Sequence, residues 1–94
     1  MSRAMVKDIQ QAVCDYYEVD QATLFARVRS RDADNARQVG MYLAREMTRL
    51  SFNQIAARFQ RTDHSTVCHA HRKIASNWHV YGRDVEAIRE RLAA

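Results

Sequence analysis

Apolar residues recur every three or four positions through most of this chain, the spacing that lines one face of an α-helix. The first such stretch predicts a helix from about residue 5 to residue 17. A short second helix is expected over residues 21–26, because Asp20 is a good N-cap residue and an apolar pair follows it. Residues 27–32 are polar and basic, which is typical of a loop. The residues predicted to face the core here are Ile9, Val13, Tyr16 or Tyr17, Leu24 and Phe25.

A third, longer helix is predicted to start at Asp32 or Asp34 and to run through Arg49. A single apolar stripe at helical spacing follows its length. This stripe consists of Val39, Leu43, Met47 and Leu50.

Two further helices are predicted from a capping pattern and a second acidic cap. Ser51 and Gln54 form a capping box, in which the serine accepts from the Gln54 backbone and the glutamine side chain reaches back. The box predicts a short helix over 52–59. Asp63 is expected to cap a second helix over about 64–78. Their inward-facing residues are predicted to be Ile55, Ala56 and Phe59, and then Val67, Ala70, Ile74 and Trp78.

The last helix is expected to follow a connection that ends at Gly82. It carries Val85, Ile88 and Leu92 at helical spacing. The 94 residues include no proline, only two glycines, no internal repeat and no linker-like segment. The sequence therefore predicts an all-α fold of about six helices, with residues 1–94 forming one domain.

The pair of helices over 52–59 and 64–78 matches the helix-turn-helix plan, in which a short helix and a longer one flank a tight turn. In that plan the first residues of the second helix enter the major groove of DNA. The residues at that position are Asp63, His64, Ser65 and Thr66, and their polar side chains are all able to hydrogen-bond base edges.

The charge of the chain is concentrated in its middle. The net charge is +4 and the isoelectric point is about 9.5. Residues 27–73 contain ten basic and four acidic residues, so this segment carries +6 and the remainder −2. A basic centre of this kind is the electrostatic footprint of a nucleic-acid-binding protein, although solvated arginines on helix faces produce the same count.

Sequence features typical of several other classes are missing. No apolar run reaches membrane-spanning length, and the first residues lack the apolar core of a signal peptide. Two cysteines, Cys14 and Cys68, favour a reduced cytoplasmic chain over a disulfide scaffold. The two glycines lie far apart, so no phosphate-binding loop is present and no bound nucleotide or other cofactor is expected.

The reactive side chains near residue 64 are candidates for catalysis and for metal binding. Asp63, His64 and Ser65 are adjacent, so on a helix start they point in different directions and cannot form a catalytic relay. His64, Cys68 and His71 share one helical face, yet no second cysteine–histidine cluster completes a tetrahedral zinc site. We therefore expect no catalytic residue and no metal ligand, and the chain is not predicted to be an enzyme.

The segment "TDHSTVCHAHRKI" resembles the "RDHSTV…A..KI" signature of the C-terminal DNA-binding domain of the bacterial replication initiator DnaA family. The resemblance extends upstream through "RSR…ARQVGMYLAREMTRLSFNQIAARF" and back to "IQQAVCDYYEVDQATLFA". It covers about residues 6–78 in order and without large gaps. It implies a Trp-repressor-like domain of six helices that binds duplex DNA as a monomer at short sites.

The resemblance also assigns expected roles to individual residues. Major-groove base contacts map onto Asp63, His64 and Ser65, with Thr66 at the same helix start. The minor-groove arginine maps onto Arg29 in the basic loop. The residues expected to contact the DNA backbone are Arg31, Arg37, Gln38, Arg45, Arg61, Thr62, His69 and Lys73.

The sequence departs from the family pattern in two places. Gln60-Arg61-Thr62 stands where the family has Gly-Gly-Arg before the Asp-His pair. The basic loop ends with Asp32 and Asp34, and Ala36 takes the place of the family's proline. These departures bear on which DNA sequence is read and leave the expected fold unchanged.

The function expected from the sequence is sequence-specific binding of double-stranded DNA, at DnaA-box-like or related sites. No ATP-binding motor is present, so the chain is expected to be either an excised domain or a stand-alone relative. Its role would be origin recognition or regulation of replication or transcription in the bacterial cytoplasm, with other replication or regulatory proteins as further candidate partners. The alternatives are a helical protein–protein adaptor with a basic face and a metal-sensing helical domain.

Overall fold

The computed structural model describes residues 5–27 and 29–93, and this part of the chain is all-α, without strands. It confirms the predicted fold class and the approximate positions of the helices. The helices are α1 (Val6–Tyr17), α2 (Gln21–Phe25), α3 (Arg31–Met47), α4 (Phe52–Arg58), α5 (Ser65–Ser76) and α6 (Trp78–Ala93).

Two predicted helix caps are present. The Asp20 carboxylate accepts a hydrogen bond from the Thr23 backbone N–H at 2.8 Å and caps α2. At the start of α4, Ser51 Oγ accepts from the Gln54 backbone N–H at 3.1 Å, and Gln54 Oε1 accepts from the Ser51 N–H at 2.8 Å. This reciprocal pair is the predicted capping box.

The start of α3 differs from its predicted position at Asp32 or Asp34. The helix begins at Arg31, and Ser30 is its N-cap residue, with Oγ accepting from the Ala33 N–H at 3.1 Å. Both aspartates therefore lie in the first helical turn. Carboxylates are favourable there because they face the positive end of the helix dipole.

The other end of α3 also differs from the prediction, because the helix stops at Met47 and does not reach Arg49. Thr48 adopts an extended conformation, with φ −126° and ψ 172°. Its hydroxyl donates at 2.6 Å to the Ala44 carbonyl, which also accepts from the Thr48 backbone N–H at 3.1 Å.

The C-terminal helices are divided differently from the prediction. The predicted helix over 64–78 ends at Ser76, since Asn77 leaves the helical conformation and donates from its side chain to the Lys73 carbonyl at 2.8 Å. Trp78 begins α6, and 42% of it is exposed, so it is not part of the α5 core face. Gly82 lies inside α6, where a Cβ would come within 2.7 Å of the Trp78 indole nitrogen.

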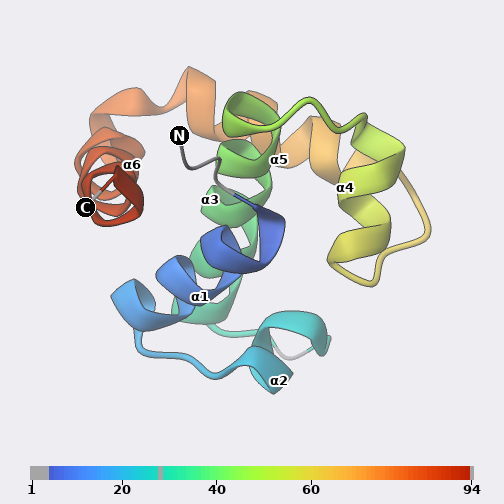
Figure 1. The fold of residues 1–94 in the computed structure, drawn as a ribbon, viewed down its shortest axis with the longest axis horizontal. Coiled ribbons are helices and arrows are strands. Elements are labelled where there is room, and N and C mark those ends of the chain that lie inside the picture. Colours follow the sequence, from blue (N-terminus) through green and yellow to red (C-terminus); the bar gives the residue numbers. More distant parts are fainter. Residues whose placement is uncertain (1–4, 28, 94) are drawn as a thin grey trace.

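The core forms around α3, which packs most extensively against α1 and α5, with the other helices at its sides (Figure 1). Gly40 of α3 lies against the Phe59 ring, and a Cβ there would stand 3.1 Å from Phe59 Cζ. The largest fully buried side chains are Phe59, Ile9, Leu24, Met41, Leu43, Ile55, Ile74, Ile88, Val13, Val39, Val67 and Val85. Most of the residues predicted to face inward are in this set.

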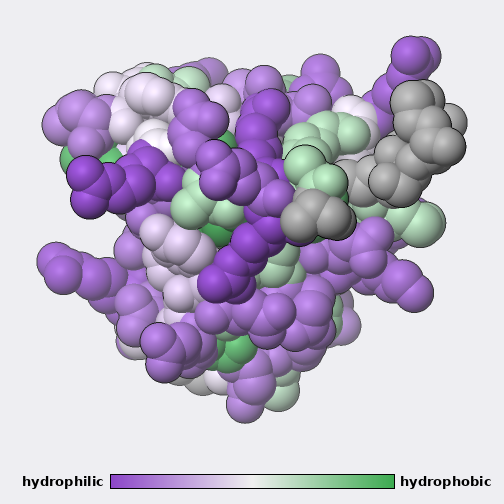
Figure 2. Space-filling view, turned by 60° about the vertical axis from the view of Figure 1, so that its left-hand side comes forward, coloured by the Kyte–Doolittle hydropathy of each residue, from purple (hydrophilic) through white to green (hydrophobic). Residues whose placement is uncertain are grey.

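This packing places the α2–α3 loop and the α4–α5 turn on the same side of α3 (Figure 1). On the face that shows α6, hydrophilic side chains dominate and apolar ones form small separate patches (Figure 2). No helix in the described residues is long and apolar enough to cross a membrane. The basic loop and the helix-turn-helix turn are thus neighbours in space, although they lie about 30 residues apart in the sequence.

Candidate nucleic-acid interface

The start of α5 presents the polar residues that the sequence singled out. The helix begins at Ser65, with His64 at the N-cap position and without a side-chain cap bond from it. Asp63 Oδ1 instead accepts from the Ser65 N–H at 2.9 Å, so the predicted cap acts from one position further out. Hydrogen bonds from Ser65 and, as a smaller cause, the electrostatic effect of His64 lower the pKa of the Asp63 carboxyl, which is therefore ionised at neutral pH.

These side chains are available to a ligand. Asp63, His64, Ser65 and Thr66 are all exposed, with 67% of the Asp63 side chain and 57% of the His64 side chain accessible. His64 Nδ1 lies 3.8 Å from Asp63 Oδ1. The arrangement offers an ionised acceptor, an imidazole and two hydroxyls in a row at a helix start, as base-edge recognition requires.

The basic loop before α3 carries exposed arginines. The Arg29 side chain is 85% exposed, and its Nε lies 3.7 Å from Asp34 Oδ2 in a loose ion pair. Arg27 is also exposed and has no hydrogen-bond or ion-pair partner in the part of the chain that the structure describes. Arg27 is not among the residues predicted to contact DNA, although it alternates with Arg29 and Arg31 in the same basic segment.

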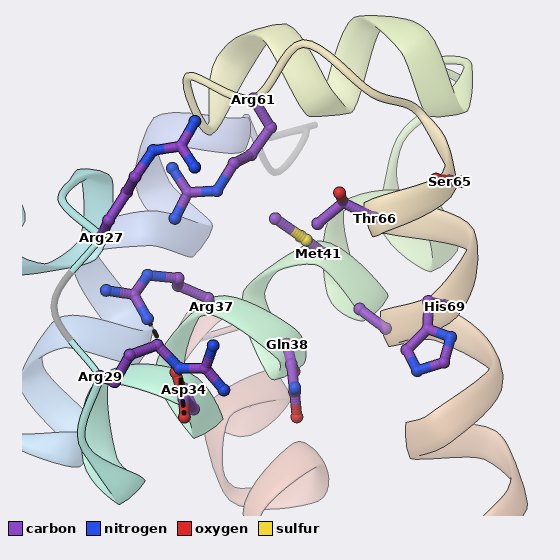
Figure 3. A pocket seen from close by; sticks show the side chains of 11 residues that line it. Arg27, Arg29, Asp34, Arg37, Gln38, Met41, Arg61, Ser65, Thr66 and His69 are labelled. Carbon is purple, nitrogen blue, oxygen red and sulfur yellow. Dashed lines mark hydrogen bonds and ion pairs between the residues drawn. The ribbon is translucent and has the colours of Figure 1, made fainter.

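A cleft of about 670 Å³ separates the basic loop from α5 (Figure 3). On one side of the cleft lie the guanidinium groups of Arg27, Arg37 and Arg61. On the other side lie three residues of α5, which are Ser65, Thr66 and His69. Four arginines line the cleft in total, against one acid, Asp34. A concave surface with this excess of positive charge attracts polyanions.

Arg37 lines the cleft but is buried, and its hydrogen bonds are directed into the protein. Only 8% of its side chain is exposed. Nε donates to the Leu24 carbonyl at 3.0 Å, and Nη2 donates to the carbonyls of Thr23 and Ala26, each at 2.9 Å. Nη1 donates to Asp34 Oδ1, also at 2.9 Å. The predicted phosphate contact does not fit this arrangement, because at least four of the five N–H donors already bind protein acceptors.

Arg61 likewise uses its guanidinium group within the protein. Nη1 donates to the carbonyls of Phe25 and Phe59 at 3.1 and 3.2 Å, and Nη2 donates to that of Ala26 at 3.2 Å. Burial and the nearby guanidinium groups of Arg37 and Arg27 lower the pKa of Arg61 from its ordinary value. The residue before it, Gln60, has a left-handed backbone with φ 56°. The first glycine of the family pattern thus corresponds to a position where glycine is the least strained residue.

The remaining predicted backbone-contacting residues lie in different places. Gln38 and His69 line the cleft, and Gln38 Oε1 is buried without a hydrogen-bond partner among the described residues. Arg45 is exposed further along α3 and stacks over the Phe52 ring, with Cζ 4.5 Å from the ring centroid. Three more, which are also exposed and lie outside the cleft lining, are Arg31, Thr62 and Lys73.

The side chains considered for metal binding have other neighbours. His71 Nε2 lies 2.9 Å from Glu46 Oε2, and its ring stacks on Tyr42 with centroids 4.9 Å apart. Within residues 5–27 and 29–93, no three His, Cys, Asp or Glu side chains are arranged to hold a metal ion. Cys68 is a free, partly buried thiol.

Comparison of the sequence with known proteins identifies one family. The family described as the bacterial dnaA protein helix-turn-helix matches residues 6–74. Chromosomal replication initiator protein DnaA of Nitrosomonas eutropha is 44% identical over 69 residues, which are 73% of this chain and 15% of that protein. The same protein of Sphingopyxis alaskensis is 43% identical over 72 residues, 77% of this chain and 16% of the relative.

A longer match is found with the chromosomal replication initiator protein DnaA of a Thermoanaerobacter species. It is 38% identical over 90 residues, which are 93% of this chain and 20% of that protein. The chain therefore spans between 15% and 20% of the length of these curated relatives.

Proposed function

This chain belongs to the bacterial DnaA helix-turn-helix family, and from that membership we propose that it binds double-stranded DNA in a sequence-specific manner. The observation that carries the proposal is the cleft between the basic loop and α5. One wall presents arginines and the other presents the hydroxyls of a helix start. A DNA strand needs both, because charge holds its phosphates while polar side chains read its bases.

In the proposed complex, the start of α5 enters the major groove. The ionised Asp63 accepts from the amino group of cytosine or adenine, and His64 and Ser65 bond neighbouring base edges. Thr66 adds a methyl group that packs on thymine. Exposure of all four residues, with no competing core contacts, supports this role.

Arg29 is proposed to enter the minor groove from the loop. Its side chain is the more exposed partner of a 3.7 Å ion pair, so it can leave Asp34 at little cost. A narrow A/T-rich minor groove has an enhanced negative potential that favours an inserted arginine.

Phosphate contacts are proposed for the exposed basic and polar residues around these two elements. Arg27 joins this set, because its guanidinium group faces the cleft and has no partner in the described residues. Arg37 and Arg61 leave the set, because their guanidinium groups donate to carbonyls inside the protein. The other members retained from the sequence prediction are Arg31, Gln38, Arg45, Thr62, His69 and Lys73.

The biological setting proposed is replication-origin recognition or regulation of replication or transcription in a bacterial cytoplasm. The named relatives are chromosomal replication initiators, and DNA is the partner that this domain would share with them. Binding needs no catalysis and no nucleotide held by these 94 residues. Other replication or regulatory proteins are proposed as additional partners.

The test is selection of bound duplexes from a random library, followed by competition binding with the His64→Ala and Arg29→Ala variants. Enrichment of a short asymmetric site is expected. Each variant is expected to lose about 1–3 kcal/mol of specific affinity, the size of a well-formed base contact. Lys7→Ala is a suitable control, since Lys7 is an exposed charge on α1 outside the cleft lining.

Two outcomes would contradict the proposal. Absence of any enriched sequence, together with weak binding to every duplex, would favour the alternative of a protein–protein adaptor with a basic face. Unchanged sequence preference in His64→Ala would show that the start of α5 does not read bases.

A further inference from the structure

Arg61 connects two segments that the sequence places far apart. Its guanidinium group donates to the carbonyls of Phe25 and Ala26 at the end of α2, 36 and 35 residues earlier in the chain. It also donates to Phe59 and, at 3.4 Å, to Gln60 in its own turn. The side chain thus bridges the α2–α3 loop and the helix-turn-helix turn (Figure 3).

The local electrostatics indicate that this bridge needs a guanidinium group. Arg37 and Arg27 lie close enough to lower the pKa of Arg61, so three like charges share one region. Such crowding is unfavourable unless the buried charges are compensated, and backbone carbonyl oxygens compensate those of Arg61 and Arg37. An ammonium group lacks the planar fork that reaches carbonyls of two segments at once.

We propose that Arg61 is a positioning residue that fixes the basic loop at a set distance from the start of α5. This inference rests on the proposed function, since it concerns how the minor-groove and major-groove contacts are held in register. In the family pattern this position is glycine, which has no side chain to form the bridge. The tether is therefore a feature of this chain's own sequence.

The consequence for DNA binding follows from the geometry. Arg29 and Ser65 both line the cleft, one from the tethered loop and one from the helix after the tethered turn. With the bridge in place, the end of α2 from which the loop starts is already fixed before DNA arrives, so less entropy is lost on binding. Without the bridge, the contacts from the loop and those from α5 form independently. The protein then loses more affinity for its specific site than for random DNA.

The experiment compares Arg61→Lys and Arg61→Ala with Arg58→Lys, a matched control at an exposed arginine of α4. The ratio of specific to nonspecific DNA affinity is expected to fall about 3- to 10-fold in both Arg61 variants, as the loss of one net hydrogen bond would produce. The control is expected to behave as wild type. Arg61→Lys is also expected to keep the wild-type salt dependence, because it retains the charge.

A second measurement needs no DNA. The Ala26 N–H donates to the Ala22 carbonyl at 3.0 Å, and its hydrogen exchange reports order at the end of α2. In Arg61→Lys this exchange is expected to accelerate several-fold, while that of the buried Ile88 in α6 stays unchanged, since local opening does not require global unfolding.

Three results would overturn the proposal. The first is an Arg61→Lys variant that keeps the wild-type DNA specificity and Ala26 hydrogen exchange, together with an Arg61→Ala variant in which the salt slope of DNA binding falls by about 0.9. That combination would identify a phosphate contact. The second is a parallel rise in exchange at Ala26 and Ile88, which would identify a purely global effect on stability. The third is unchanged Ala26 exchange in the Arg61 variants, together with a wild-type protein that selects no DNA sequence. In that last case the proposed function also fails, and the selection experiment identifies the failure separately.

Discussion

Replacing Arg37 with methionine is expected to destabilise the fold strongly and to change DNA binding only through that loss. Methionine keeps most of the aliphatic stem and removes the guanidinium group. The carbonyl oxygens of Thr23 and Leu24 then lose the Arg37 donor in a buried environment. The Ala26 carbonyl keeps only its bond from Arg61, and Asp34 keeps only its loose ion pair with Arg29.

The magnitude follows from the burial of these groups. Breaking a buried ionic network by removing one partner typically costs about 3–5 kcal/mol. Asp34 is one-third exposed, at 33%, so water can replace its lost partner, and its share is discounted. The carbonyls lie under an Arg37 side chain that is only 8% exposed, so their share is retained. The expected loss in unfolding free energy is therefore about 3 kcal/mol, near the lower end of that range.

The assay is urea unfolding followed by circular dichroism at 222 nm, with Arg31→Met as the matched control. Arg31 is exposed on the same helix, so its replacement is expected to change stability by less than about 0.5 kcal/mol. For a domain of this size, a loss of 3 kcal/mol corresponds to a fall in Tm of about 12–24 °C.

The reasoning about Arg37 would be refuted by one particular pair of results. These are stability within about 0.5 kcal/mol of wild type, together with a salt slope of DNA binding that is reduced by about 0.9. That pair would show a phosphate-bound Arg37, as the sequence alone predicted.

Three other changes have distinct expected outcomes. Arg27→Ala should weaken binding to all duplexes alike and reduce the salt slope of DNA binding by about 0.9. Arg89→Ala on α6 should leave that slope unchanged. Equal slopes for the two variants would exclude a phosphate contact by Arg27. Gln60→Gly should stabilise the fold by about 1 kcal/mol in thermal unfolding, because glycine adopts φ 56° without strain, and a destabilised variant would contradict this. Hydrogen bonds from Thr23 lower the pKa of Asp20 in the folded state. The stability that these bonds add is therefore present above the ordinary carboxyl pKa and is lost as the pH falls through the lowered pKa of the folded state. Asp20→Asn should therefore lose less stability than wild type between pH 5 and pH 2 in acid titrations, and an equal loss would contradict the assignment.

The features that the sequence predicted correctly are those with local causes. Ser51 and Gln54 stabilise the start of α4 through bonds that span three residues, so the pattern is visible in the letters themselves. The apolar stripes similarly predicted which faces are buried. The exposed position of Asp63 and His64 also followed, because polar residues at a helix start after a tight turn have no apolar surface to cover.

The features that the sequence misplaced depend on contacts between distant segments or on a break in a continuing pattern. Trp78 follows Ile74 at helical spacing, so periodicity alone extends α5 across Asn77, where the helix actually ends. Arg37 has the same appearance in the sequence as an exposed arginine. Its carbonyl partners come from residues 11 to 14 positions earlier, and only the fold shows that they surround it.

The turn before α5 shows how one departure from the family pattern is compensated by another. Gln60, which stands where the family pattern has glycine, adopts a left-handed backbone at a cost of about 1–2 kcal/mol for a residue with a side chain. Arg61 replaces the second glycine, and its hydrogen bonds to Phe25 and Ala26 supply stabilisation of similar size, since bonds from a charged donor contribute about 1.5–3 kcal/mol. Gln60 and Arg61 together make a strained but tethered turn. The two substitutions therefore act together, and Gln60→Gly in the presence of Arg61 should retain the tether while removing the strain.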